Sequence, residues 1–386
     1  MRMNRECPTM SSLPIIDKQS VIDMNSTCNK LASSSDQSPD SNPDFATIRL
    51  VSRIVLFILK KCWLCCGASV FLIFFIYWYY GSILALCLFF FAASAFLYQL
   101  GDWLLYHPDQ PPHSRIFVRS PSMMNLPSDN LHIVTADGVR INVVMVKQDS
   151  SIFNQVPTIL YLHGNAGNIG HRLPNVHGLY HFCGCNILLL EYRGYGHSDG
   201  IPSEEGLYFD AQAGLEFLLK HPGIDKQKIV VFGRSLGGAV AIDLASRPEY
   251  SSRIMTLIIE NTFTSIPDTA KVLFNWSIVK WLPVWIFKSQ FRSIDKIVKV
   301  LVPTLFISGL ADAIIPPHMM QELYQASRSK MKQMAVFENG THNETWQCNG
   351  YYRTINLFLD DVMLSKHQNQ VLQWPVSPHH VKMEII

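Results

Sequence analysis

Short apolar runs recur along the C-terminal two thirds of the chain, separated by polar turns and by stretches of helical periodicity. Two helical patterns stand out, at residues 206–221 and 350–364. Strands and helices that alternate in this way predict an α/β fold, in which a mostly parallel sheet is covered by helices on both faces. The runs that we interpret as strands lie at 131–134, 141–146, 157–162, 186–190, 229–232, 257–260, 304–309 and 333–337.

A much longer apolar run precedes this region. No charged residue occurs between Cys62 and Leu100, and a bilayer span needs only about 20 apolar residues. The run predicts a membrane anchor with one of two topologies. Either one span is followed by an interfacial or tilted helix, or two short spans meet near Gly81 and Ser82. The aromatic cluster at residues 77–80 resembles an interfacial belt and supports the second topology.

The charges that flank the run favour a cytosolic N-terminus. Basic residues precede it, whereas Asp102 and Asp109 partly offset Arg115 and Arg119 after it. A single span would then make the chain a type II membrane protein with a luminal or extracellular catalytic domain, which is the topology we favour. A hairpin with a cytosolic domain is the alternative. The preceding basic residues are Arg49, Arg53, Lys60 and Lys61.

A luminal domain would expose three Asn-x-Ser/Thr sequons to glycosylation, at Asn275, Asn339 and Asn343. The last two flank His342, where a glycan would obstruct the site described below, so we do not expect all three to be used.

Composition divides the chain into five segments. The first segment is rich in Ser, Asp, Asn and Pro and buries too little apolar area to offset the entropy of ordering. The expected segments are a disordered tail at 1–46, a membrane anchor at 47–105, a linker at 106–130, an α/β-hydrolase-like domain at 131–366 with a lid insert at 264–300, and a C-terminal tail at 367–386.

The pentapeptide Gly233-Arg-Ser-Leu-Gly237 carries the strongest chemical signal. An apolar strand precedes it and small, helix-forming residues follow it. This context predicts a nucleophile elbow, a sharp strand-to-helix turn that exposes the hydroxyl of Ser235. Gly233 and Gly237 are needed because the strand and the helix pass too close together for a Cβ.

An acid and a base follow the elbow in the order that this site requires, Ser, then Asp, then His. Asp312 comes just after the strand at 304–309, and His342 comes just after the strand at 333–337. Asp312 could instead cap the helix that begins near His318. Asp360 and Asp361 lie after His342, which is the wrong order. We therefore predict a catalytic triad of Ser235, His342 and Asp312.

Two backbone amides are expected to stabilise the oxyanion. One belongs to Leu236, which follows the nucleophile, and the other to Asn165, in the loop after the strand at 157–162. No Lys-Ser/Thr pair follows this glycine-rich loop, so a phosphate-binding loop is not expected. His163 is expected to brace the turn, and Arg193 is expected to form a structural ion pair with Asp199.

Five motifs together resemble the α/β-hydrolase superfamily and, within it, the Bem-like serine hydrolases. The resemblance runs from about Tyr80 to about Lys366 and implies a membrane-anchored serine hydrolase without a fixed substrate. Some related membrane hydrolases cleave fatty acyl esters or thioesters. The motifs are His163-Gly-Asn-Ala-Gly-Asn168, Tyr192-Arg-Gly-Tyr-Gly196, Gly233-Arg-Ser-Leu-Gly-Gly238, Ser308-Gly-Leu-Ala-Asp312 and Gly340-Thr-His342.

Charge and cysteine content exclude several other classes. The net charge of the 386-residue chain is +2, and no basic cluster with interleaved aromatics points to nucleic acid. The nine cysteines form neither a disulfide framework nor a zinc pattern, since Cys183-x-Cys185 has no second pair. We expect no metal and no cofactor, and the sequence leaves the oligomeric state open.

Aromatic residues between 274 and 287 suggest the nature of the substrate. They form either an ordinary surface helix or a lid that walls an acyl-chain pocket. Together with the anchor, a lid favours hydrolysis of carboxylic ester or thioester bonds in lipids or in acylated small molecules or proteins. A serine peptidase on the same fold and a catalytically silent membrane scaffold are the alternatives.

Overall fold

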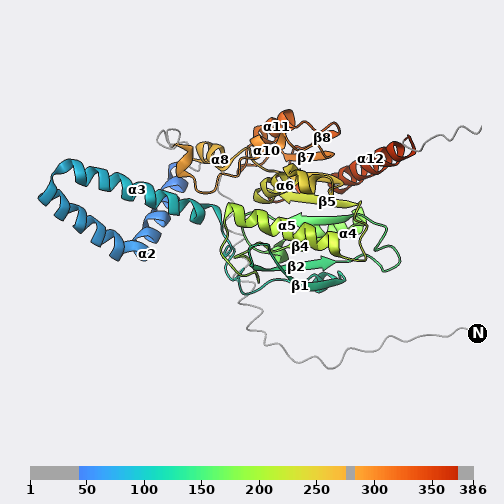
Figure 1. Ribbon diagram of the computed structural model, residues 1–386, viewed down its shortest axis with the longest axis horizontal. Coiled ribbons are helices and arrows are strands. Elements are labelled where there is room, and N and C mark those ends of the chain that lie inside the picture. The colour runs from blue at the N-terminus through green and yellow to red at the C-terminus, as the bar shows by residue number, and fades with distance from the viewer. Residues whose placement is uncertain (1–42, 275–282, 373–386) are drawn as a thin grey trace, which may run out of the picture. The chain divides into compact units, whose positions relative to one another are not determined.

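The computed structural model describes residues 43–274 and 283–372 (Figure 1). The chain divides into two compact units, Met1–Phe89 and Phe90–Ile386. Each unit is described by itself below. The tail at 1–42, the C-terminal residues 373–386 and a stretch of the insert at 275–282 lie outside the described residues, and with them Asn275, Trp276 and Trp281.

The apolar run forms two helices rather than one. Helix α2 covers Pro43–Tyr80 and helix α3 covers Ser82–Leu105. Gly81 separates them with a φ of 87°, a left-handed conformation that glycine adopts without strain. In the described part of the chain, only α3 is long and apolar enough to cross a membrane, and the apolar part of α2, Cys65–Tyr80, is shorter. This is weak evidence for an anchor, and it leaves the topology undetermined.

The second unit is built on an eight-stranded sheet with the order β1-β2-β4-β3-β5-β6-β7-β8. Strand β2 pairs antiparallel with β1 and β4, and the other strands run parallel. The mostly parallel sheet of the predicted α/β class is therefore confirmed. The strands are β1 (Ser128–Val134), β2 (Arg140–Val146), β3 (Thr158–Leu162), β4 (Asn186–Leu190), β5 (Ile229–Arg234), β6 (Thr256–Glu260), β7 (Thr304–Gly309) and β8 (Lys332–Phe337).

Helices cover both faces of this sheet (Figure 1). Helices α4 and α12 pack together on one face, and α5, α6 and α10 pack together on the other. The helices of this unit are α4 (Leu173–Cys183), α5 (Glu204–Lys220), α6 (Leu236–Ser246), α7 (Pro248–Ser251), α8 (Ile266–Leu273), α10 (Ser293–Ile297), α11 (Pro317–Ala326) and α12 (Tyr351–Leu372), with short 3-10 turns η1 (Pro121–Met124), η2 (Ile169–Arg172), η3 (Val284–Ile286) and η4 (Thr345–Gln347).

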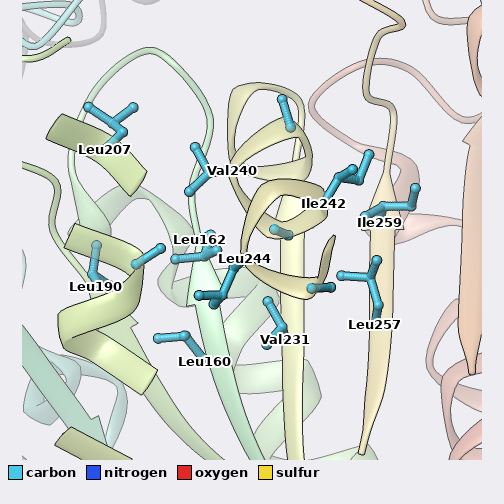
Figure 2. Packing of buried hydrophobic residues seen from close by; sticks show 14 of the residues in the cluster. Leu160, Leu162, Leu190, Leu207, Val231, Val240, Ile242, Leu244, Leu257 and Ile259 are labelled. Atoms are coloured by element: carbon cyan, nitrogen blue, oxygen red, sulfur yellow. The ribbon is translucent and has the colours of Figure 1, made fainter. Parts of the chain in front are cut away.

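The alternation of side chains along each strand produces two separate apolar layers. In β3, Leu160 and Leu162 belong to the layer under α6, whereas Ile159 and Tyr161 belong to the layer under α12. Figure 2 shows residues of the first layer, in which side chains of β4, β3, β5 and β6 lie under those of α5 and α6. Each such leucine or isoleucine contributes about 1.5–3 kcal/mol by leaving water. These layers fix the strands whose carboxyl ends carry the candidate site.

The segment expected as a linker, 106–130, is packed onto the domain. It contains η1 and the first residues of β1. The side-chain amide of Asn168 donates to the carbonyl oxygens of Ser114 at 2.8 Å and Phe117 at 2.9 Å. The segment is therefore bound to the loop that follows β3, which is one wall of the candidate site.

The expected ion pair between Arg193 and Asp199 is wrong. Arg193 instead pairs with Asp137 at 2.6 Å and with the buried Asp210 at 2.9 Å, and the exposed Asp199 pairs with Arg140 at 3.1 Å. The reason lies in the buried Asp210, which accepts from the backbone N–H of Arg193 at 2.8 Å and from its Nε at 2.9 Å. The side chain of Asp199 stays at the surface, where Arg140 is its partner.

Candidate active site

Ser235 lies on the turn between β5 and α6, with a φ of 55° and a ψ of −121°. This conformation is strained for a residue with a side chain and persists only where the surroundings enforce it. Here two glycines beside Ser235 impose this conformation. A Cβ on Gly233 would overlap the backbone of Gly237, and a Cβ on Gly237 would overlap the carbonyl of Leu162. The local geometry is that of the predicted elbow.

The structure brings the three residues of the predicted triad together. The imidazole Nε2 of His342 lies 2.9 Å from Oγ of Ser235, and its Nδ1 lies 2.7 Å from Oδ2 of Asp312. All three side chains are largely buried, with 7–8 % of each residue exposed. They follow β5, β7 and β8, whose carboxyl ends lie on the same edge of the sheet because β5 to β8 run parallel.

The surroundings of Asp312 select one tautomer of His342. Its Oδ1 accepts hydrogen bonds from the N–H groups of Ile314 at 2.9 Å and Ile315 at 2.8 Å, which stabilises the carboxylate. Because a carboxylate only accepts, Nδ1 of His342 carries the proton and donates it. Nε2 then presents a lone pair to the hydroxyl of Ser235.

Close contact between two glycines joins the loops that carry the acid and the base. A Cβ on Gly309 would overlap the carbonyl of Gly340, and the N–H of Ala311 donates to that carbonyl at 3.0 Å. Side chains at either position would push the loops apart. The glycines therefore set the distance between Asp312 and His342.

Asn261, directly after β6, is a positioning residue that the sequence analysis missed. Its side-chain Oδ1 accepts from the N–H of Gly309 at 2.8 Å. Its Nδ2 donates to the carbonyl of Thr341 at 3.1 Å and to Oγ1 of Thr345 at 3.0 Å. One buried amide thus connects the acid loop to the base loop. Its place just past a strand end, between the elbow and Asp312, was the only available signal.

A buried polar cluster lies next to the elbow. Arg234 donates from its guanidinium to the carbonyl of Asn343 at 3.0 Å, and so holds the loop that carries His342. The carboxyl of Glu260 is fully buried and accepts from the hydroxyl of Tyr351. Burial raises the pKa of Glu260, and the nearby charge of Arg234 acts in the opposite direction.

The two predicted oxyanion donors lie next to the nucleophile. Leu236 begins α6, and Gly164, which precedes Asn165, lies so close that its Cβ would sit 3.5 Å from Cβ of Ser235. Over the described stretches 43–274 and 283–372, no hydrogen bond occupies the backbone N–H of Leu236 or of Asn165. Both N–H groups are therefore available to an oxyanion.

His163 is fully buried beneath this loop. Its Nδ1 donates to the carbonyl of Gly164 at 2.7 Å, and its Nε2 lies 3.3 Å from a carboxylate oxygen of Glu191. The other oxygen of Glu191 accepts from the N–H of Ile169 at 3.2 Å. These contacts hold both ends of the loop 164–169 and agree with the expected bracing role of His163.

The described residues contain no group of three or more His, Cys, Asp or Glu side chains arranged to hold a metal ion. Cys183 and Cys185 are also unsuited to chemistry, because burial raises the pKa of the Cys183 thiol to about 12 and that of the Cys185 thiol further. A thiol with so high a pKa is a poor nucleophile at neutral pH. Ser235 is the better candidate.

Two of the three sequons can be located. Asn339 and Asn343 are exposed, while Asn275 lies outside the described residues. Thr345, which completes the sequon of Asn343, is fully buried, and its hydroxyl donates to the carbonyl of Thr341 at 2.7 Å. Asn343 directly follows His342, so a glycan there would stand beside the site.

A serine at a strand-to-helix turn, facing a histidine and an aspartate from later strands of this sheet, is the arrangement of an α/β hydrolase. Comparison with known proteins agrees. Residues 157–293 match the family model described as "alpha/beta hydrolase fold". A solved esterase of Pyrococcus furiosus, Pf2001, covers 67% of this chain and 98% of its own length with a TM-score of 0.54 and 20% identity, which shows a shared fold.

Closer relatives are found among curated sequences. Protein bem46 of Schizosaccharomyces pombe is 40% identical over 271 residues, which are 69% of this chain and 88% of the relative. The α/β hydrolase domain-containing protein WAV2 of Arabidopsis thaliana is 38% identical over 285 residues, 70% and 90% of the two chains. An uncharacterised membrane protein of Saccharomyces cerevisiae is 33% identical over 270 residues, 69% and 90%. The chain therefore belongs to the Bem46-like α/β hydrolases.

Proposed function

We propose that this protein is a membrane-anchored serine hydrolase that cleaves carboxylic ester or thioester bonds. The family and the fold support hydrolase activity. The hydrogen-bonded series Ser235–His342–Asp312, with Ser235 on a strained turn, is the observation that carries the finer assignment.

In the first half of the reaction, Oγ of Ser235 attacks the carbonyl carbon while Nε2 of His342 takes the hydroxyl proton. Asp312 holds the imidazolium that results. The tetrahedral oxyanion is stabilised by the N–H groups of Leu236 and Asn165. When the intermediate collapses, His342 returns the proton to the departing alcohol or thiol, and the acyl group stays on Ser235.

Water completes the second half of the reaction. His342 removes a proton from a water molecule, which attacks the acyl-enzyme and forms a second oxyanion between Leu236 and Asn165. Collapse of this intermediate releases a carboxylic acid and returns the proton to Oγ of Ser235. The cycle needs neither a metal nor a cofactor.

Apolar surface on the insert supports a lipid or acylated substrate. Trp285 is 66% exposed and Leu273 is 48% exposed, so the described parts of the insert present large apolar side chains at the surface. An apolar wall of this kind suits an acyl chain. The expected result is faster hydrolysis of medium- and long-chain acyl esters than of acetyl esters. Equal rates across chain lengths would remove the support for a lipid substrate.

The proposed anchor has a single span, as in a type II protein, and places the catalytic domain on the luminal or extracellular side. The long apolar helix α3 and the similarity to a yeast membrane protein support the anchor. Protease treatment of sealed vesicles that contain a C-terminally tagged protein tests the orientation. Protection of the tag favours the single span, and digestion of the tag favours the hairpin with a cytosolic domain.

Labelling with a fluorophosphonate probe tests the proposed chemistry directly. The full-length protein in membranes is expected to be labelled, and Ser235→Ala is expected to lose the label. Ser246→Ala is the matched control, because Ser246 is half-buried at the end of the same helix and its hydroxyl donates to the carbonyl of Asp243 at 2.8 Å. That variant is expected to be labelled like the wild type.

The two alternatives give different results. A serine peptidase would also be labelled but would cleave peptide amides at least as well as esters of matched acyl groups. A silent scaffold would stay unlabelled although correctly folded, and that outcome would overturn the proposal.

A further inference from the structure

The segment that ends α3 and leads into the hydrolase domain contacts the loop of the candidate oxyanion hole. Around His107, the chain runs beside Ala166 as an isolated parallel bridge. The N–H of His107 donates to the carbonyl of Asn165 at 2.9 Å, and its carbonyl accepts from the N–H of Gly167 at 3.3 Å. The side-chain Nδ2 of Asn165 donates to the carbonyl of Leu105 at 3.0 Å.

One more side chain, from within the hydrolase domain, binds Asn165. The hydroxyl of the buried Tyr195 donates to the carbonyl of Asn165 at 2.8 Å. Asn165 therefore has its carbonyl and its side chain fixed by three hydrogen bonds, and two of the three partners belong to residues 105–107. These bonds restrict the backbone and the side chain of Asn165, and with them the orientation of its own N–H.

The same segment also binds the insert, on its other side, through an ion pair and hydrogen bonds. Asp102 pairs with Lys288 at 2.5 Å and accepts from the hydroxyl of Ser289 at 2.8 Å. The hydroxyl of Tyr106 lies 3.0 Å from that of Ser289, and its ring packs edge-on against Phe291. Tyr106 is 5% exposed, so this is a packed interface rather than a surface contact.

Small displacements of an oxyanion donor are costly. A donor must lie 2.7–3.1 Å from the developing charge, and removal of one donor lowers kcat by roughly 10²–10³. The loop 164–167 contains two glycines, so it has little stiffness of its own. Its alignment depends on external contacts.

We propose that residues 102–107, at the domain end of α3, are positioning residues that hold the N–H of Asn165 in the oxyanion hole. The candidate anchor helix is then not only a tether, because its last turn completes the active site. This inference rests on the proposed hydrolase function.

Two variants of the full-length protein test it. Asn165→Ala removes the bond to the carbonyl of Leu105, and Asp102→Ala removes the bonds to Lys288 and Ser289 without touching the oxyanion loop. Asn356→Ala is the matched control, since Asn356 makes the same kind of amide-to-carbonyl bond, to Phe182 at 2.6 Å, on the exposed side of α12. Thermal unfolding identifies any general loss of structure.

The kinetic readouts distinguish positioning from a merely structural role. For Asn165→Ala, kcat on a soluble ester is expected to fall roughly 10–100-fold with KM changed less than about threefold, since only transition-state binding is lost. The inhibition constant of a trifluoromethyl ketone, whose adduct carries an oxyanion, should rise by the same factor. Asp102→Ala should show the same pattern at about 3–10-fold, and Asn356→Ala should match the wild type.

Hydrogen exchange gives a readout that does not require activity. The amide of Gly167 should exchange faster in Asp102→Ala than in the wild type, because its acceptor at His107 is no longer held. Unchanged exchange, or faster exchange with wild-type kcat, overturns the inference. A wild-type protein that is never labelled by fluorophosphonate overturns the proposed function instead, and this inference falls with it.

Discussion

The two halves of the candidate active site meet at Ser235 but are held by different parts of the chain. His342 and Asp312 are held from within the hydrolase domain, by Asn261, by Arg234 and by contact between glycines. The oxyanion loop around Asn165 depends largely on residues 105–107, which precede the sheet.

The comparison separates the residues proposed to carry out the chemistry from the residues proposed to stabilise the oxyanion. The triad half is fixed by buried side chains that follow or end strands of the sheet, namely Arg234 and Asn261. The oxyanion half is fixed by backbone contacts from a segment with its own attachment to the insert. Changes in the two halves should therefore produce different defects.

Gly237→Ala is expected to have the largest effect, because it acts on both halves at once. The new Cβ would overlap the carbonyl oxygens of Leu162 and His163, which are backbone atoms of the strand that carries the oxyanion loop. Overpacking of this kind costs about 1–3 kcal/mol. We expect fluorophosphonate labelling to disappear and the Tm of the domain, followed by circular dichroism, to fall by about 2–12 °C.

Gly101→Ala is the control for this variant. Gly101 lies in α3, and a Cβ there meets no atom within 4 Å. Alanine is also the better helix former. A wild-type Tm in Gly237→Ala would show that the elbow tolerates a side chain, and the close-approach argument would be wrong.

Asn261→Ala is expected to break the triad half alone. Without its bonds to Gly309, Thr341 and Thr345, the acid and base loops can separate. A displacement of about 1 Å lowers kcat by roughly 10²-fold. The hydrogen-bond partners of Asn261 and Asn165 do not overlap, so the effects of Asn261→Ala and Asn165→Ala should multiply in the double variant. A double variant no slower than either single variant would show that the two halves are not independent.

The smallest expected effects concern pH, and they have opposite signs at two carboxyl groups. In the turn between β1 and β2, hydrogen bonds from Arg193 lower the pKa of Asp137 from 3.8 to about 2. A lowered pKa stabilises the fold above pH 4, and this contribution is lost as the pH falls towards 2. The pair is partly exposed, which limits the contribution to about 1 kcal/mol. Asp137→Asn should lower the Tm at pH 6 and leave it nearly unchanged at pH 2.

Glu260 provides the opposite case in the triad half. Burial raises its pKa above the ordinary value of 4.5. A raised carboxyl pKa contributes stability that is present below pH 4.5 and is lost as the pH rises through the folded-state pKa. Glu260→Gln should therefore remove a decline of Tm that begins above pH 4.5, measured at constant ionic strength. An unchanged decline in the variant would show that the carboxyl is already ionised in the folded protein at these pH values.

Local patterns in the sequence predicted most of the sheet and the order of the triad. Each strand is a compact apolar run with a turn signal at its end, and Ser235, Asp312 and His342 each follow such a run. A residue just past a strand end in a parallel sheet has nearly a fixed place in space. This is why three positions far apart in the chain could be expected at one edge of the sheet.

The contacts that hold the site could not be predicted in the same way. Asn261 belongs to no motif. Its positioning role depends on the close approach of two loops, which Gly309 and Gly340 allow. The predicted partner of Arg193 was wrong because the buried Asp210 accepts from both the backbone N–H and the side chain of Arg193, a contact that their separation in the sequence does not reveal. We predicted a linker at residues 106–130 because few of them are apolar. The segment binds the side chain of Asn168 through its backbone carbonyl groups, and a sequence pattern does not reveal such contacts.

The conformation of Ser235 also bears on how such a protein can change over evolutionary time. With a φ of 55° and a ψ of −121°, the hydroxyl-bearing residue costs the fold about 1–3 kcal/mol, and glycine at the same position would relieve that cost. Inactivation at this position is therefore thermodynamically downhill. A lineage released from selection for catalysis would keep its fold, and even gain stability, as it lost the nucleophile. At the site of the proposed nucleophile, retention of a serine in spite of this cost is what selection for chemistry would leave.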